Sequence, residues 1–404
     1  MIVYVLMLCS FAVATAEFVL VGLLSEVAAD LSVSLPAAGF LVTAYMVVVT
    51  VGGPVAAVLT RRLPRRGLLA ATMAIALLSA AGSAAAGSYG TLLAARLGSA
   101  LAQALFMAVA SQVAMAAVPP ERQTAAVAKV FNGFALATVI GLPLGTLVGQ
   151  AYGWRATFVL VTALAAAGLA GVLLVAPAVP HDAGGTVRGN VTAVLRAPVL
   201  LGLLVTGFAL TGFVAAFTYV APVLREVTGL GPAAVSAALV VYGLGTIAGN
   251  LLAGRVRPAR ILPVLPAPLG ALAVVLLAQG VLLRHPVAAV LSLFALGASA
   301  FAVVPLVQTW LMGEVGPGAA GLVAAVNISV AGLAGALGAA LGAAVIGTGL
   351  GLPAISPIAA LPTLAALLTA ALLRTARPRD QGIGATPPGV SRHQSLDHAS
   401  GGEG

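Results

Sequence analysis

The sequence predicts an all-α membrane protein whose twelve transmembrane helices form two six-helix halves. First, 61% of the 404 residues are hydrophobic and 7% are charged, with a mean hydropathy of +1.13, whereas a soluble domain carries about 25% charged residues. Second, apolar stretches of about 20 residues, the length that crosses a bilayer, recur along the chain. Third, one long connection near the middle leaves six such stretches on each side.

Short connections with arginine, glycine or proline separate the expected spans. In the N-terminal half, residues 1–176, the spans lie near 2–24, 37–60, 67–87, 91–117, 125–149 and 156–176. In the C-terminal half, residues 198–373, they lie near 198–222, 232–253, 261–283, 286–311, 321–347 and 353–373. Residues 177–197 form the expected cytoplasmic central loop. Residues 374–404 are polar and rich in Pro, Gly and Ser, and we expect a disordered cytoplasmic tail.

The net charge of +9 comes mainly from arginines in the short connections, a pattern of membrane topology that argues against nucleic acid as a partner. If the N-terminus lies inside, fourteen of the eighteen arginines fall on the inner side, and only Arg155, Arg225 and Arg284 lie in outer loops. The positive-inside rule therefore predicts two cytoplasmic termini. The abundance of Arg, Ala and Gly hints at a bacterial genome of high GC content, and hence at a multi-pass protein of the bacterial plasma (inner) membrane.

The two halves repeat one another. The second span is followed by RRLPRR at 61–66, and the eighth by RVRPAR at 255–260. Parallel six-helix repeats with a substrate site between them are a known plan of secondary transporters.

Glu17 is the only acidic residue inside an expected span. A charge at the bilayer centre costs about 2.5–3.5 kcal/mol on insertion scales, so such residues usually line a cavity and serve a function. Desolvation favours the protonated form, which suits a proton carrier. The alternative is a structural carboxylate bonded to a neighbouring helix.

The fifth span carries Gly141, Gly145, Gly149 and Gly153 at four-residue intervals, with Pro143 inside the ladder. A helix face without side chains lets another helix approach closely, and the proline removes a backbone donor and favours a bend. The alternative is ordinary packing of small residues.

These motifs resemble those of the major facilitator superfamily, and within it the twelve-span drug:proton antiporters, over about residues 1–375. The ladder with Pro143 is similar to that group's antiporter motif, Gly153-Trp154-Arg155 to its usual ending, and the basic turn at 61–66 to the loop after the second span. Glu17-Phe18 with Gly22-Leu23-Leu24, and Phe217-Thr218-Tyr219 with Ala221-Pro222, resemble the arabinose-exporter-like and chloramphenicol-exporter branch.

The resemblance implies the major facilitator fold and export of a small, partly hydrophobic compound, a drug or antibiotic such as a phenicol, in exchange for protons by alternating access. It implies proton coupling by Glu17 and Arg96, helix packing by the antiporter motif (Gly141, Pro143, Gly145 and Gly149), and a cytoplasmic gate loop that contains Arg61, Arg62, Arg65 and Arg66. The loop lacks the aspartate that usually pairs with an arginine there. Glu121 or Glu314 on other cytoplasmic loops could replace it.

Polar residues in the spans that line the cavity of this superfamily are candidate substrate contacts: Tyr45, Gln103, Asn132, Tyr219 and Asn327. Each has an alternative role as an interhelical hydrogen-bond partner. For Arg96 the alternative is an arginine whose head extends to the outer membrane interface.

The sequence contains no phosphate-binding GxxxxGK[ST] loop and no HExxH, and Cys9 is its only cysteine. We therefore expect no enzyme, no cofactor and no metal site. The expected partners are a small-molecule substrate, protons and the lipid bilayer, and we expect a monomer. A sugar or metabolite exporter of the same branch, and a non-transporting membrane sensor on the same scaffold, remain as alternatives.

Overall fold

The computed structural model describes residues 1–59, 63–119, 123–175, 191–315 and 317–375. Within these ranges every regular element is a helix, and twelve helical segments are long and apolar enough to cross a membrane. The expected fold class is thereby confirmed. The predicted tail beyond 375, most of the predicted central loop, Arg61, Arg62 and Glu121 lie outside the described residues.

The N-terminal half consists of α1 (Ile2–Phe18), the 3₁₀ turn η1 (Val19–Leu23), α2 (Leu24–Asp30), α3 (Leu35–Leu59), α4 (Arg65–Ala84), α5 (Tyr89–Ala116), α6 (Gln123–Leu136), the π-helical turn η3 (Ala137–Gly141), α7 (Leu142–Tyr152) and α8 (Trp154–Val175). The first span is longer than expected, because the chain stays helical past residue 24 as far as Asp30.

The C-terminal half consists of α9 (Val191–Val194), α10 (Ala197–Thr218), α11 (Val220–Glu226), α12 (Pro232–Gly254), η4 (Pro258–Arg260), α13 (Ile261–Val264), α14 (Pro266–Leu282), α15 (Pro286–Glu314), α16 (Pro317–Gly347), η5 (Leu352–Ala354) and α17 (Ile355–Thr375).

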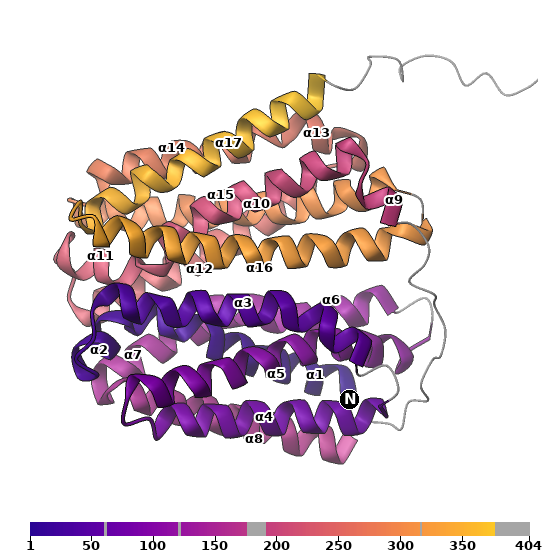
Figure 1. The fold of residues 1–404 in the computed structure, drawn as a ribbon, viewed down its shortest axis with the longest axis horizontal. Helices are drawn as coiled ribbons and strands as arrows, with labels where there is room; N and C mark the ends of the chain where they lie inside the picture. Colours follow the sequence, from indigo (N-terminus) through magenta and orange to yellow (C-terminus); the bar gives the residue numbers. More distant parts are fainter. Residues whose placement is uncertain (60–62, 120–122, 176–190, 316, 376–404) are drawn as a thin grey trace, which may run out of the picture.

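The two halves pack in the same pattern. In the N-terminal half the first span contacts the fifth and sixth, through α1 with α6 and α8, and in the C-terminal half α10 contacts α16 and α17 in the same way. The packing of α4 on α5 and α8 is likewise repeated by α14 on α15 and α17. Figure 1 shows the halves as two layers, in which α3 of one half lies beside α16 of the other. Further contacts between the halves join α7 and η3 to α12, and α11 to η1 and α2.

The first span of each half is interrupted at a corresponding level. In the first half Leu23, at the end of η1, precedes α2 with φ −129° and ψ 15°, and in the second half Tyr219 separates α10 from α11 with φ −106° and ψ 16°. Interrupted helices at the interface between repeats commonly form transporter binding sites.

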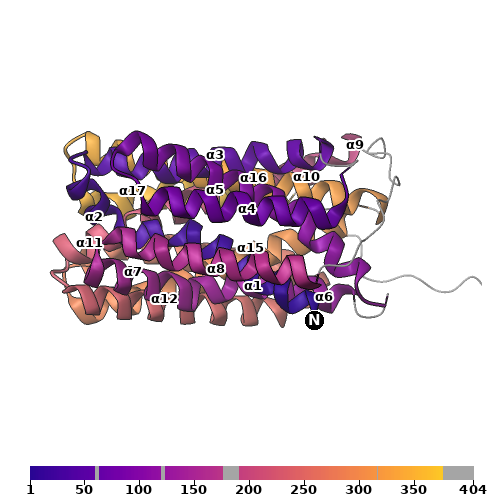
Figure 2. The same ribbon diagram turned by 90° about the horizontal axis from the view of Figure 1, so that it is seen from below.

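All the long helices run along one axis, so the bundle has two ends (Figure 2). We call the end that holds the start of α1 and the end of α17 the terminal face, and the opposite end, with α2 and α11, the far face. The terminal face carries seven of the described arginines: Arg65, Arg66, Arg196, Arg255, Arg257, Arg260 and Arg374.

Candidate functional site

Glu17 lies in the last turn of α1, immediately before the helix changes to the 3₁₀ turn η1. Among the carboxylates in the described ranges it alone lies in the middle of a span, since Glu26, Asp30, Glu226 and Glu314 all lie at helix ends near one face or the other. The Glu17 side chain is half-buried.

A chain of two hydrogen bonds joins Glu17 to α5 and α3. The Nε2 atom of Gln103 donates to Oε2 of Glu17 over 2.6 Å, and the hydroxyl of Tyr45 donates to Oε1 of the same glutamine over 2.7 Å. Tyr45 is 1% exposed and Gln103 is 4% exposed. Of the residues expected to contact substrate, Gln103 therefore contacts the candidate proton carrier directly, and Tyr45 contacts Gln103.

Arg96 on α5 completes the group, which we call the central cluster: Glu17, Tyr45, Arg96 and Gln103. Its guanidinium lies 4.3 Å from the centre of the Tyr45 ring, a cation–π contact. It donates hydrogen bonds to the backbone oxygens of Ala16 and Glu17. Because the residue is only 1% exposed, its side chain is buried in the bundle and does not extend to a membrane interface.

The glycine ladder packs against the span that carries Glu17. A Cβ atom added at Gly141 would meet Thr15, one at Gly145 would meet Val19, and one at Gly149 would meet Leu23. The π-helical turn η3 ends two residues before Pro143. Proline has no N–H for the helical ladder, which accounts for the local change of winding.

The segment Gly153-Trp154-Arg155, which follows the glycine ladder, links the start of α8 to the ends of α2 and α4 at the far face. Gly153 has φ +85°, a conformation that glycine adopts without strain, and it separates α7 from α8. Trp154 Nε1 and Arg155 donate to Oδ2 of Asp30 over 3.1 and 2.6 Å, and Arg155 also donates to the backbone oxygen of Ala86.

The other candidate substrate contacts lie apart from the central cluster. Asn132 on α6 is exposed. Asn327 on α16 is 4% exposed, and it donates to Gln308 over 2.5 Å and accepts from Thr206 over 2.7 Å. Tyr219 is fully buried, and its hydroxyl lies against Gly39 of the other half.

Of the gate loop, Arg65 and Arg66 are described. Arg66 donates to the backbone oxygen of Leu173 over 2.6 Å, which ties α4 to the end of α8 within the N-terminal half. Glu314 lies at the end of α15, at the terminal face. The role of either residue in a latch stays a prediction.

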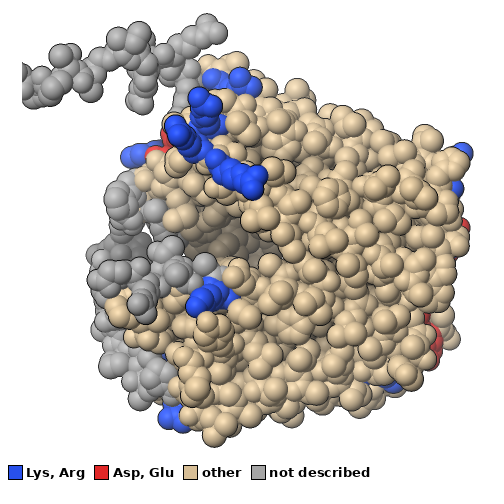
Figure 3. All heavy atoms as spheres, turned by 180° about the vertical axis from the view of Figure 1, so that it is seen from behind, with Lys and Arg blue, Asp and Glu red and all other residues tan. Residues whose placement is uncertain are grey.

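The contacts between the halves close the far face. Arg225 of α11 forms an ion pair with Glu26 of α2, across 199 residues of sequence. Tyr219 lies against Gly39. Deeper in the bundle, Thr246 lies 3.4 Å from Thr138, oxygen to oxygen. Towards the terminal face, Figure 3 shows a hollow between the two halves. Sequence reasoning missed the Glu26–Arg225 pair, whose only signal was one charge of each sign near the outer ends of the first and seventh spans.

Comparison with known proteins agrees with this architecture. The family model of the Major Facilitator Superfamily matches residues 6–339, so the chain belongs to the major facilitator superfamily of membrane transporters, which are not enzymes. The Escherichia coli K12 inner membrane transport protein YdhP is 35% identical over 359 residues, which cover 89% of this chain and 92% of that protein. A chloramphenicol resistance protein of Streptomyces lividans is 36% identical over 347 residues, covering 83% and 88% of the two chains.

Solved structures share the fold. A bacterial homologue of the human lysosomal transporter Spinster, solved in an inward-facing and unoccupied conformation, superposes with a TM-score of 0.73 at 17% identity, covering 92% of this chain and 95% of that one. The twelve apolar helices and the inner-membrane relative identify a multi-pass plasma membrane transporter of small molecules.

Proposed function

We propose that this protein exports a small, partly hydrophobic compound from the cytoplasm in exchange for protons. The observation that carries the proposal is Glu17, the one mid-span carboxylate of the described chain, held by Gln103 next to the buried Arg96. Placing an ionisable side chain at membrane depth costs free energy. A purely structural contact between helices does not require such a side chain.

The arrangement of the halves supports alternating access. The hollow in Figure 3 lies between the halves near the terminal face, whereas the far face is closed by the Glu26–Arg225 pair and by Tyr219. The seven described arginines at the terminal face, against Arg155, Arg225 and Arg284 at the far face, support a cytoplasmic terminal face. In that orientation the hollow lies on the cytoplasmic side, where an exporter loads its substrate.

In the proposed cycle the halves rock about the central cluster. Glu17 takes up a proton when the far face is open and releases it towards the cytoplasm when the terminal face is open. One proton that moves down a potential of 100 mV supplies about 2.3 kcal/mol, to which the pH gradient adds. The similarity to a chloramphenicol resistance protein supports a phenicol as the first substrate to test.

The test uses proteoliposomes in which an imposed pH gradient drives substrate movement. We expect Glu17→Gln to abolish proton-driven transport while the protein reaches the membrane in normal amount, because the amide keeps the size but cannot carry the proton. Asp30→Asn is the matched control, since it removes a carboxylate of the same span that is paired with Arg155 at the far face. Full coupled transport by Glu17→Gln would refute the assignment.

A substrate panel separates the remaining alternatives. Movement of sugars or metabolites in place of phenicols would support the metabolite exporter. Failure of the wild-type protein to move any substrate or proton would support the non-transporting sensor.

A further inference from the structure

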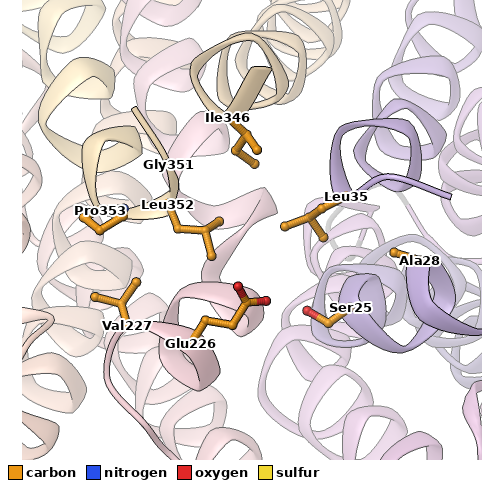
Figure 4. Close-up of a pocket in the computed structure, with 9 residues that line it drawn as sticks. All are labelled: Ser25, Ala28, Leu35, Glu226, Val227, Ile346, Gly351, Leu352 and Pro353. Atoms are coloured by element: carbon orange, nitrogen blue, oxygen red, sulfur yellow. The ribbon is translucent and has the colours of Figure 1, made fainter. Parts of the chain in front are cut away.

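A second cavity lies at the far face, apart from the central cluster. It has a volume of about 710 Å³, within the range of about 300–1,000 Å³ that is typical of small-molecule sites. Figure 4 shows that both halves line it, with Ser25 and Leu35 on one side and Glu226, Ile346 and Leu352 on the other.

One uncompensated charge faces this cavity. The carboxylate of Glu226 points into it from the end of α11 (Figure 4) and forms no ion pair with any described residue. The neighbouring Arg225 is already paired with Glu26 of the other half. The three charges at this part of the interface therefore sum to one negative charge, located on the cavity wall.

The opposite wall adds a polar group without a partner. The side-chain oxygen of Ser25 points into the cavity (Figure 4), is shielded from solvent and has no hydrogen-bond partner among the described residues. The rest of the lining is mainly apolar, with Leu35, Ile346 and Leu352 converging from three helical elements.

We propose that this cavity binds an organic cation with an apolar body, such as a quaternary ammonium or phosphonium compound. The single carboxylate attracts the charge, and the leucine and isoleucine side chains cover the body. Calcium or magnesium does not suit the site, because these ions require several oxygen ligands. Since the walls belong to both halves, the cavity in this form exists only while the far face is closed.

The test measures binding and needs no transport. Purified protein in lipid nanodiscs is titrated with radiolabelled tetraphenylphosphonium by equilibrium dialysis. The parent protein is Glu17→Gln, so that the central carboxylate contributes nothing to the signal. We expect saturable binding, and a loss of affinity of about tenfold or more when Glu226→Gln is added.

Two further variants distinguish the cavity from a surface effect. Leu35→Trp fills the cavity and keeps the charge, so it also weakens binding, whereas Asp30→Asn removes a far-face carboxylate outside the cavity and leaves the affinity unchanged. Neutral triphenylphosphine oxide binds more weakly than the cation. Absence of saturable binding in the Glu17→Gln parent, or binding insensitive to Glu226→Gln and Leu35→Trp, would overturn the proposal. Neither result would bear on proton-driven export.

Discussion

Gln103 donates its amide N–H to the carboxylate of Glu17 over 2.6 Å, while Arg96, two turns earlier on the same helix, binds the backbone oxygens of Ala16 and Glu17. The direct partner of the Glu17 carboxylate is thus a neutral amide. An amide has both donors and acceptors, so a half-turn of its plane would present an oxygen to a protonated Glu17. Proton uptake at Glu17 then breaks no ion pair.

Replacing Gln103 by leucine should slow proton-driven transport about tenfold or more. It leaves the Glu17 carboxylate and the Tyr45 hydroxyl without their partner, and an unsatisfied buried polar group costs about 1–3 kcal/mol. Gln279→Leu is the matched control, because Gln279 is equally buried but bonds Ser292 in the other half. Initial rates in proteoliposomes measure the effect. Equal rates for the two variants would contradict the assigned role of Gln103.

Two substitutions should distinguish the two contacts of Tyr45, its hydrogen bond to Gln103 and its cation–π contact with Arg96. Tyr45→Phe keeps the ring under Arg96 and loses only the bond to Gln103, so we expect a loss of about 0.5–1.5 kcal/mol in stability. Tyr45→Leu also removes the cation–π contact and leaves a buried guanidinium uncovered, and should cost about 0.5–2 kcal/mol more. Thermal unfolding temperatures in detergent give the order of stability of the wild type and the two variants. Equal unfolding temperatures for Phe and Leu would exclude a stabilising ring contact.

Because α1 packs closely against the glycine ladder, a substitution on α1 should restore stability that is lost by a substitution in the ladder. Gly141→Ala inserts a methyl group against Thr15, and overpacking of this kind costs about 1–3 kcal/mol. Adding Thr15→Ala should recover most of that loss. Gly90→Ala serves as the control, because a Cβ there meets no atom within 4 Å. The measurement is again thermal unfolding. If Thr15→Ala gives no recovery, the strain lies elsewhere.

The Glu26–Arg225 pair should hold the far face closed. Arg225→Gln should shift the population towards an open far face, about fivefold for each 1 kcal/mol lost, and the exchange Glu26→Arg with Arg225→Glu should restore closure. Spin labels at the exposed positions Ser34 and Ala233, in a Cys9→Ser background, report the distance between the halves. An unchanged distance distribution in Arg225→Gln would show that the pair does not control closure.

Much of the fold follows from the sequence. A membrane span must satisfy its backbone hydrogen bonds internally and remain apolar, so length and hydropathy suffice to locate all twelve spans. The first span extends further than expected, to Asp30, because charged residues near the end of a helix do not stop it from winding. The seventh span ends earlier than expected, at Thr218, and the separate helix α11 follows it to Glu226.

The site was predictable only in part. The residue types of Glu17, Arg96, Tyr45 and Gln103 indicated function, but sequence gives the depth of a residue in the membrane and not the direction in which its side chain points. The bonds of Tyr45 to Gln103 and of Gln103 to Glu17 could not be predicted from the sequence, and contact of the two residues with substrate stays a prediction. The partners Glu26 and Arg225 lie in different halves, and only the packing of those halves brings them together.

The π-helical turn at Ala137–Gly141 has a consequence for the length of the fifth span. A π turn holds about one residue more than an α turn, so it is the mark that a single-residue insertion leaves in a helix. Gly133 before the turn and Gly141, its last residue, both face α1. Deleting one residue within 137–141 would therefore leave a regular α-helix whose two ends still face α1, so this turn is the place in the fifth span where the number of residues can change by one.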